Sequence, residues 1–558
     1  MRYTKRYFWF ALIIIATLML KLNTWSDDYA KISSFRGAEL KGDVFYPLIA
    51  RSLNEEGLLT LEIDGEARVN LDSNLYMDGE MIPCMSLNFI QSIFGASANA
   101  CEGVITVERN GERYKFVVGE DEAEKNNSSF KLSKAPVNSG NEYYLPIEDL
   151  CKLFNYEYAW DEATYSVSLS SPDGDESYLP KAYDLRKYNR VSEVRDQGTE
   201  ATCWAFASIE ALESSIRPEQ QMLFDPQHMI KNNTYGRNAN DGGDYMIAVS
   251  YLLSWNGPVE EGTSEVCKHL QSVRFFDETD LDAIKWAIYQ CGAVSTSIYV
   301  DVSSGSMDDS SYYNDAKGSY CYMGNKEPNH DVIIIGWDDN YSSANFNNQV
   351  DEDGAFICMN SWGDDFGDDG VFYVSYEDSN IGSQGVAYET LSSINNYDSI
   401  YQTDLCGQIG TIGYSKSEIY GANVYKAECD ETLRAVGFYS TSEDTDYTVY
   451  AVDNYTGEKS LLNRVEVASG TVDTKGYFTI PLEKRIELKK GDSFAVVVRL
   501  ETPNTDHPMA VEYESEKRTK KITIEDGIGF VSRNGVDWES SEEKYNANVC
   551  LKAYTNNR

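Results

Sequence analysis

Residues 195–214 (RDQGTEATCWAFASIEALES) constrain this chain more than any other segment, because they place a cysteine where a helix should begin. The run that follows Cys203 is amphipathic with a helical period and predicts a helix over residues 204–216. A thiol at a helix N-terminus loses its proton more readily, above all when an imidazolium lies beside it. The segment therefore predicts a nucleophilic thiol, provided that the fold brings a histidine to it.

Suitable partners for Cys203 stand far downstream in the sequence. His330 directly precedes the apolar run VIIIGW, which is typical of a strand, and it is the candidate base. Asn360 opens the block NSWGDDFGDDGVFYVSY, and its side-chain carbonyl would hold the imidazole in one tautomer. Trp362 would shield that contact from water. Gln197 lies six residues before Cys203, so its side-chain amide and the Cys203 N–H are candidate donors to an oxyanion.

These segments resemble the papain-like cysteine peptidases. The family reads Q-G-x-C-G-S-C-W-A-F where this chain reads Q-G-T-E-A-T-C-W-A-F, and its N-S-W-G-x-x-W-G-x-x-G-Y block is similar to the one at Asn360. YDLR at residues 183–186 resembles the start of the mature domain. Gly242 and Gly243 resemble the Asn-Gly-Gly wall, whose backbone pairs with an extended substrate.

The resemblance implies an α+β fold with a two-lobed papain-like core. A helical lobe led by Cys203 would face a β-rich lobe that bears His330 and Asn360. The implied catalytic residues are Cys203, His330, Asn360 and Gln197, and the implied substrate-binding residues are Gly242, Gly243 and Trp362.

The chain lacks one disulfide bridge that the resemblance implies. Glu200 and Asn240 stand where the resemblance implies a disulfide, so both partners are missing together. We expect their Cα atoms within about 7 Å, the spacing that a bridge would need. Glu200 would either accept a hydrogen bond from the Asn240 amide or point into solvent. Ala201, Thr202 and Phe366 also differ from the usual family residues without removing a catalytic group.

The length of the chain predicts several domains, of which the first two segments concern export. Residues 1–25 combine early basic residues with the apolar run 8–20, which is shorter than the roughly 20 residues of a membrane span. They are interpreted as a signal peptide or an N-terminal membrane anchor, and residues 26–58 as a tether. Both interpretations predict an extracellular or cell-surface protein.

Residues 59–170 carry a weak internal repeat. Each copy has an apolar-Pro step, a short amphipathic helix and an alternating strand, at residues 81–108 and again at residues 144–170. This pattern resembles the copper amine oxidase N-terminal-like domain of bacterial surface proteins. The segment contains no histidine, so copper is not expected and no cofactor is predicted for the chain.

The peptidase domain is placed at residues 181–391. Further helices are expected at residues 244–255 and 280–290, and strands at residues 332–337, 355–360 and 370–375. Residues 394–558 contain short alternating runs separated by Gly and Asp turns, which predict a β-sandwich. A sandwich after a papain-like domain resembles the lectin-like domain of bacterial surface peptidases, which implies a possible cell-surface glycan partner. Its aromatic residues Tyr447, Tyr450 and Trp538 are interpreted as packing residues.

Composition excludes other classes of function. The net charge of −42 repels polyanions, so nucleic acid is not an expected partner. The chain has eleven cysteines without a CxxC motif and only four scattered histidines, which argues against structural zinc. The acidic loop at residues 338–353 lacks EF-hand spacing and is interpreted as solvated.

The sequence thus predicts an extracellular papain-like cysteine endopeptidase that hydrolyses peptide bonds in protein or peptide substrates through a Cys203 thioester. Two alternatives remain. An amine instead of water would resolve the thioester in a transpeptidase or transamidase. The chain would otherwise be a non-enzymatic surface adhesin, which has no need to keep Cys203, His330, Asn360 and Gln197 together.

Overall fold

The computed structural model describes residues 60–558 except for short intervals. The intervals left out are 64–65, 69–74, 78–81, 95, 102, 110–111, 126–127, 140–141, 155, 162–165, 171–178, 219, 278–279, 302–309, 516–518, 520–521 and 525–526. The expected export segment (1–25) and tether (26–58) lie outside the described residues. The chain divides into two compact units, Met1–Tyr178 and Leu179–Arg558.

The N-terminal unit contains the same order of elements twice, as the weak repeat predicts. Each copy has a strand, a helix of eight residues and a strand pair: β4 (Cys84–Ser86), α4 (Leu87–Phe94), β5 (Ser97–Cys101) and β6 (Val104–Arg109), then β11 (Glu142–Pro146), α5 (Ile147–Phe154), β12 (Glu157–Asp161) and β13 (Ser166–Ser170). Strands β4 and β11 pair antiparallel, and the rings of Phe94 and Phe154 lie 5.1 Å apart. The two copies therefore share one core.

The remaining strands of this unit complete three small sheets. They are β1 (Thr60–Ile63), β2 (Glu66–Arg68), β3 (Leu75–Tyr76), β7 (Glu112–Val117), β8 (Glu122–Lys125), β9 (Ser128–Lys131) and β10 (Val137–Ser139). The sheets have the orders β12-β13-β1-β2, β10-β11-β4-β3 and β5-β6-β7-β8-β9.

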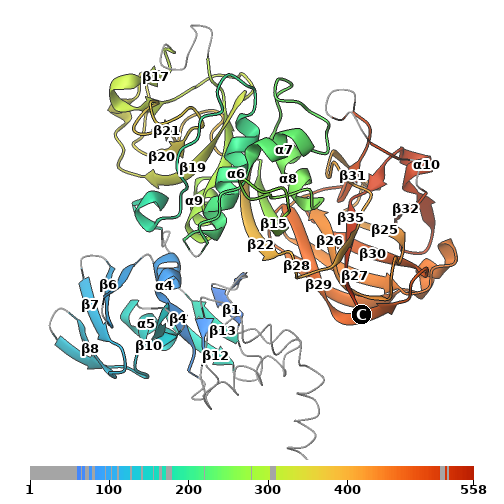
Figure 1. Ribbon diagram of the computed structural model, residues 1–558, viewed down its shortest axis with the longest axis horizontal. Coiled ribbons are helices and arrows are strands. Elements are labelled where there is room, and N and C mark those ends of the chain that lie inside the picture. The colour runs from blue at the N-terminus through green and yellow to red at the C-terminus, as the bar shows by residue number, and fades with distance from the viewer. Residues whose placement is uncertain are drawn as a thin grey trace, which may run out of the picture. The chain divides into compact units, whose positions relative to one another are not determined.

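The second unit begins with the helices and strands of the predicted peptidase segment (Figure 1). The helices are α6 (Cys203–Ile216), α7 (Pro226–Asn232), α8 (Tyr245–Leu253) and α9 (Leu281–Gln290). The strands are β14 (Ala182–Asp184), β15 (Lys268–Phe276), β16 (Val294–Ile298), β17 (Tyr313–Asn314), β18 (Ser319–Tyr320), β19 (His330–Asp338), β20 (Ala355–Met359), β21 (Val371–Ser375) and β22 (Gly385–Ser393). Among the described residues, no helix is long and apolar enough to cross a membrane.

Helix α6 is the centre of this segment, and it is buried almost all round instead of being amphipathic. It contacts α7 and α8 as well as β19 and β22. Glu210 and Glu213, which the sequence pattern leaves to solvent, are 1% and 0% exposed. The Arg195 guanidinium lies 2.7 Å from the Glu213 carboxylate. A buried carboxylate is tolerated when a cation pairs with it, and that pairing explains the burial of Glu213.

The C-terminal segment forms the expected sandwich, but one of its sheets continues into the peptidase segment. Its elements are β23 (Ser399–Tyr401), β24 (Gly410–Ile412), β25 (Glu418–Lys426), β26 (Glu431–Ser440), β27 (Thr445–Val452), β28 (Val465–Val472), β29 (Gly476–Leu488), β30 (Ser493–Glu501), β31 (Met509–Glu512), β32 (Gly529–Ser532), β33 (Trp538–Ser540), α10 (Ser541–Tyr545), β34 (Asn548–Val549) and β35 (Leu551–Asn557).

Strand β15 pairs with β29, so one sheet runs from the site to the C-terminal sandwich. Its order is β17-β18-β21-β20-β19-β16-β22-β15-β29-β26-β35-β23. A second sheet, β28-β27-β30-β25-β32-β33, closes the sandwich around its own core. Figure 1 shows β26 and β29 beside β15 and β22. The main core of the unit includes Tyr439 and Tyr477 of the C-terminal segment, so the two segments pack as one unit.

Candidate active site

Cys203 is the first residue of α6 and lies against the first residues of β19. Thr202 precedes it as the N-cap and is fully buried. The Cys203 side chain is partly exposed, and the backbone N–H groups of Asp331 and Trp204 hydrogen-bond to its sulfur. The fold therefore brings the predicted nucleophile to the strand that carries the predicted base.

His330 begins β19 and is held from two sides. Its Nε2 lies 2.8 Å from the side-chain oxygen Oδ1 of Asn360, which is fully buried just after β20. Because that oxygen can only accept, Nε2 donates and Nδ1 is left as the basic nitrogen. The Trp362 ring lies 4.6 Å from the imidazole ring, centroid to centroid, and is tilted by 30°. The Trp362 ring thus lies against the imidazole, next to the contact that it is expected to shield from water.

Burial and local charge act on the two reactive groups in opposite directions. Close packing around the thiol raises the pKa of Cys203 to about 12, and the nearby Asp331 carboxyl also raises it. Burial lowers the pKa of His330 to about 4. Both shifts favour the neutral thiol and imidazole. The Asp331 N–H, the N-terminus of α6 and the attraction between thiolate and imidazolium favour the ion pair.

Gln197 is fixed beside this pair by Ser361 and Glu200. Its backbone N–H donates to the Ser361 carbonyl over 2.8 Å, and its side-chain oxygen accepts from Ser361 Oγ at 2.7 Å. Its Nε2 donates one hydrogen to the Glu200 carbonyl at 2.7 Å. An amide nitrogen carries two hydrogens, so one remains for an oxyanion.

Gly242 and Gly243 precede α8 and face different surroundings. Gly242 has a φ of +67°, and a Cβ there would meet no atom within 4 Å. A Cβ on Gly243 would lie 2.6 Å from Nε1 of Trp204. Asp244 caps α8 by accepting a hydrogen bond from the Met246 N–H at 3.0 Å. Gly243 therefore packs against Trp204 of α6, whereas the space beside Gly242 is free of other atoms.

The segments that carry Glu200 and Asn240 run side by side. The Ala201 N–H donates to the Ala239 carbonyl at 2.9 Å. Glu200 and Asn240 are both exposed, and their side chains make no hydrogen bond to each other within the described part of the chain. Of the two expected arrangements, Glu200 therefore points into solvent. Cys203 itself forms no disulfide, as a nucleophilic thiol requires.

Sequence reasoning missed Asp331, the residue after His330. It is a carboxyl with 7% exposure whose oxygen accepts from Ser297 Oγ at 2.5 Å. Burial raises its pKa to about 7. The sequence feature that could have revealed Asp331 is a charged residue at the start of the apolar run of β19, a strand that is buried on both faces.

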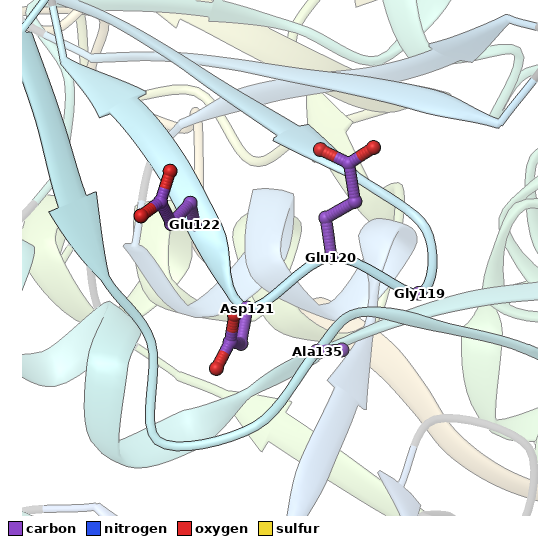
Figure 2. Close-up of a pocket in the computed structure, with 5 residues that line it drawn as sticks. All are labelled: Gly119, Glu120, Asp121, Glu122 and Ala135. Atoms are coloured by element: carbon purple, nitrogen blue, oxygen red, sulfur yellow. The ribbon is translucent and has the colours of Figure 1, made fainter.

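The remaining candidate features are a pocket, an acidic loop and three aromatic residues. The N-terminal unit has an open pocket lined by Gly119, Glu120, Asp121, Glu122 and Ala135, and Figure 2 shows its carboxylates pointing away from one another. Among the described residues, which include the loop 338–353, no group of three His, Cys, Asp or Glu side chains could hold a metal ion. In the sandwich, Trp538 is 7% exposed and Tyr447 and Tyr450 pack on core clusters.

A thiol at a helix start, an imidazole held by an amide oxygen and a two-lobed α+β fold define a class of cysteine hydrolase. Three family models match the chain: papain family cysteine protease at residues 179–394, copper amine oxidase N-terminal domain at 62–169 and lectin like domain at 400–555. The chain carries a papain-family cysteine protease domain between a copper amine oxidase N-terminal-like domain and a lectin-like domain.

The chain is also similar to individual proteins. It is 29% identical over 230 residues to falcipain-3 of Plasmodium falciparum (isolate 3D7), covering 39% of this chain and 45% of that protein. It is 29% identical over 225 residues to mouse (Mus musculus) cathepsin S, covering 36% and 60%. The chain spans about half the length of the curated relatives it matches first.

Two solved structures are similar to this chain over 68% of its length. The clostridial cysteine protease Cwp84 after propeptide cleavage has a TM-score of 0.60 and 25% identity, covering 68% of this chain and 99% of that one. The cysteine protease and lectin-like domains of Cwp84, a surface layer associated protein of Clostridium difficile, have a TM-score of 0.59 and 24% identity, covering 68% and 89%.

Proposed function

We propose that this chain is a cysteine endopeptidase, a hydrolase that cleaves peptide bonds through a thioester on Cys203. The contact of 2.8 Å between His330 Nε2 and Asn360 Oδ1 carries the proposal, because it leaves Nδ1 as the base at the strand that Cys203 contacts. The papain-family match over residues 179–394 supports the same chemistry.

The reaction uses the groups in the following order. Cys203 gives its proton to His330 Nδ1, and its sulfur attacks the peptide carbonyl carbon. The remaining Nε2 hydrogen of Gln197 and the backbone N–H of Cys203 donate to the oxyanion. The imidazolium then protonates the leaving amine as the C–N bond breaks. His330 next takes a proton from water, whose oxygen displaces the thiolate from the thioester.

The glycine wall at Gly242 and Gly243 is the proposed binding surface for the substrate. Gly242 and Gly243 pair with the backbone of an extended peptide, and Trp362 bounds the place where it reacts. We propose that the substrates are proteins or peptides outside the cell or at its surface. The apolar run at residues 8–20 and the likeness to Cwp84, described as surface layer associated, support that location. The lectin-like match supports a glycan partner for residues 400–555.

Replacing the thiol tests the function. Cys203→Ala should abolish both hydrolysis of a fluorogenic peptide library and labelling by a thiol-directed epoxide, while the circular dichroism spectrum stays that of the wild type. Cys429→Ala is the matched control, because Cys429 is a partly exposed, unpaired thiol of the C-terminal segment. It should keep both signals. Full hydrolysis by Cys203→Ala would refute the assignment.

Product analysis separates water from an amine as the group that resolves the thioester. Mass spectrometry of products made with an added primary amine should show free carboxylates. Products that carry the amine would instead identify a transpeptidase or transamidase.

A further inference from the structure

Asp331 is a buried carboxyl beside the proposed nucleophile that has no cation of its own. It is 7% exposed and follows His330 on β19. Its one side-chain hydrogen bond comes from Ser297 Oγ, at 2.5 Å to Oδ1. No lysine, arginine or histidine of the described residues contributes to its electrostatic surroundings. A buried carboxylate without a cation is costly, so this residue needs a partner to become ionised.

The strands aim this carboxyl at the α6 side of the sheet. Asp331 is paired with Ser297 across β19 and β16, and their side chains meet. The carboxyl acts electrostatically on Cys203 at the start of α6 and on Tyr388 of β22. Asp244, which caps α8 next to the glycine wall, raises the pKa of Asp331 together with burial. The groups that face it from α6, α8, β16 and β22 are therefore acidic or neutral.

The second carboxylate oxygen of Asp331, Oδ2, has no hydrogen-bond partner among the described residues. Ser297 donates to Oδ1 alone, so the lone pairs of Oδ2 are available to accept a hydrogen bond from a substrate. The Asp331 N–H hydrogen-bonds to the Cys203 sulfur, so a peptide that reacts at Cys203 lies close to this residue. The Asp331 carboxyl therefore lies near the scissile bond, and Asp244 is the other acidic group that acts on it.

We propose that Asp331 determines specificity, by accepting the cationic side chain of a substrate lysine or arginine near the scissile bond. This inference rests on the proposed peptidase function. The substrate ammonium or guanidinium donates to Oδ2, while Ser297 keeps donating to Oδ1. The resulting charge-assisted hydrogen bond supplies the cation that the carboxylate lacks. An acidic substrate side chain is rejected, because Asp331 and Asp244 both repel it.

Matched peptides test the inference in the full chain. Fluorogenic peptides carry lysine or norleucine, which has the same carbon chain without the charge, at each of the four positions nearest the scissile bond. At one position the wild type should prefer lysine about ten- to a hundredfold in kcat/KM, the range for a hydrogen bond to a charged group. Asp331→Asn should bring that ratio to about one. The ratio is measured within one enzyme, so any change in Cys203 reactivity cancels.

Glu210→Gln is the matched control. Glu210 is also a buried carboxyl with a raised pKa, seven residues beyond Cys203 on α6, which is about 10 Å along the helix. In Glu210→Gln the ratio of kcat/KM for the lysine peptide to that for the norleucine peptide should equal the wild-type ratio. A wild-type ratio near one at all four positions overturns the inference, whether or not any variant folds. An unchanged ratio in Asp331→Asn overturns it as well. Failure to hydrolyse any peptide, without epoxide labelling of Cys203, would overturn the proposed function instead.

Discussion

Gly243→Ala should damage both stability and activity, because the new methyl group has no room. Its Cβ would lie 2.6 Å from Nε1, 2.7 Å from Cδ1 and 2.8 Å from Cε2 of Trp204. Non-bonded carbon atoms prefer a separation of about 3.5–4.0 Å, so the ring or the wall has to move by about 1 Å. Trp204 is 1% exposed within the main core, and a close-packed core gives it little space.

The expected magnitude follows from this clash. Overpacking of a core by one methyl group costs about 1–3 kcal/mol, so the free energy of unfolding should fall by that amount. Trp204 directly follows Cys203, and a reactive group misplaced by about 1 Å loses about a hundredfold in rate. We therefore expect kcat/KM to fall about ten- to a hundredfold. Urea denaturation and peptide kinetics measure the two effects.

A double-mutant cycle with Trp204→Phe attributes the cost to the ring. The smaller ring leaves room, so Gly243→Ala should cost less stability in the Trp204→Phe background than in the wild type. Gly242→Asn is the neighbouring control for stability. Asparagine tolerates the φ of +67°, and its side chain enters open space, so the free energy of unfolding should stay close to wild type. An equal cost of Gly243→Ala in both backgrounds would refute this reasoning.

Three further outcomes are expected. Gln197→Ala should lower kcat about ten- to a thousandfold with little change in KM, because the Gln197 amide donates to the oxyanion of the transition state. A raised KM with unchanged kcat would instead make Gln197 a binding residue. Asn360→Ala should lower kcat about ten- to a hundredfold by releasing His330, and an unchanged kcat would contradict the positioning role. Burial lowers the pKa of His269 to about 4, against about 6.5 when unfolded, so the folded state loses stability as pH falls from about 6.5 toward 4. His269→Phe, which preserves the stack on Trp255, should show a smaller stability loss over that range, and an identical loss in chemical denaturation would count against this cause.

Local patterns carried most of what the sequence could predict. The helices expected at residues 204–216 and 280–290 are α6 (Cys203–Ile216) and α9 (Leu281–Gln290), since capping and apolar period act over a few neighbouring residues. The helix expected at 244–255 ends at Leu253, because Trp255 adopts a φ of +62°. The order of motifs also pointed to His330 and Asn360, which the structure brings within 2.8 Å.

Tertiary pairing is what the sequence could not supply. The polar positions of α6 suggested a solvent-facing side, yet Glu213 is buried because Arg195, far from it in sequence, pairs with it. The sheet shared by the two segments depends on the pairing of Ser272 with Phe478, and no local pattern encodes such a register. Asp331 went unnoticed for the same reason, since its importance comes from the neighbours that the fold places around it.

The shared unit supplies other links near positions 200 and 240, where the resemblance implies a disulfide that this chain lacks. The segment that carries Asn240 lies between Tyr235 and α8, and both ends of it are tied to the C-terminal segment. Tyr235 Oη and Ser250 Oγ donate to the Cys406 carbonyl at 2.9 and 2.7 Å. Each buried hydrogen bond contributes about 0.5–1.5 kcal/mol, so the pair approaches the roughly 2–4 kcal/mol of a disulfide. The C-terminal segment thus anchors the chain on both sides of the stretch that carries Asn240, Gly242 and Gly243.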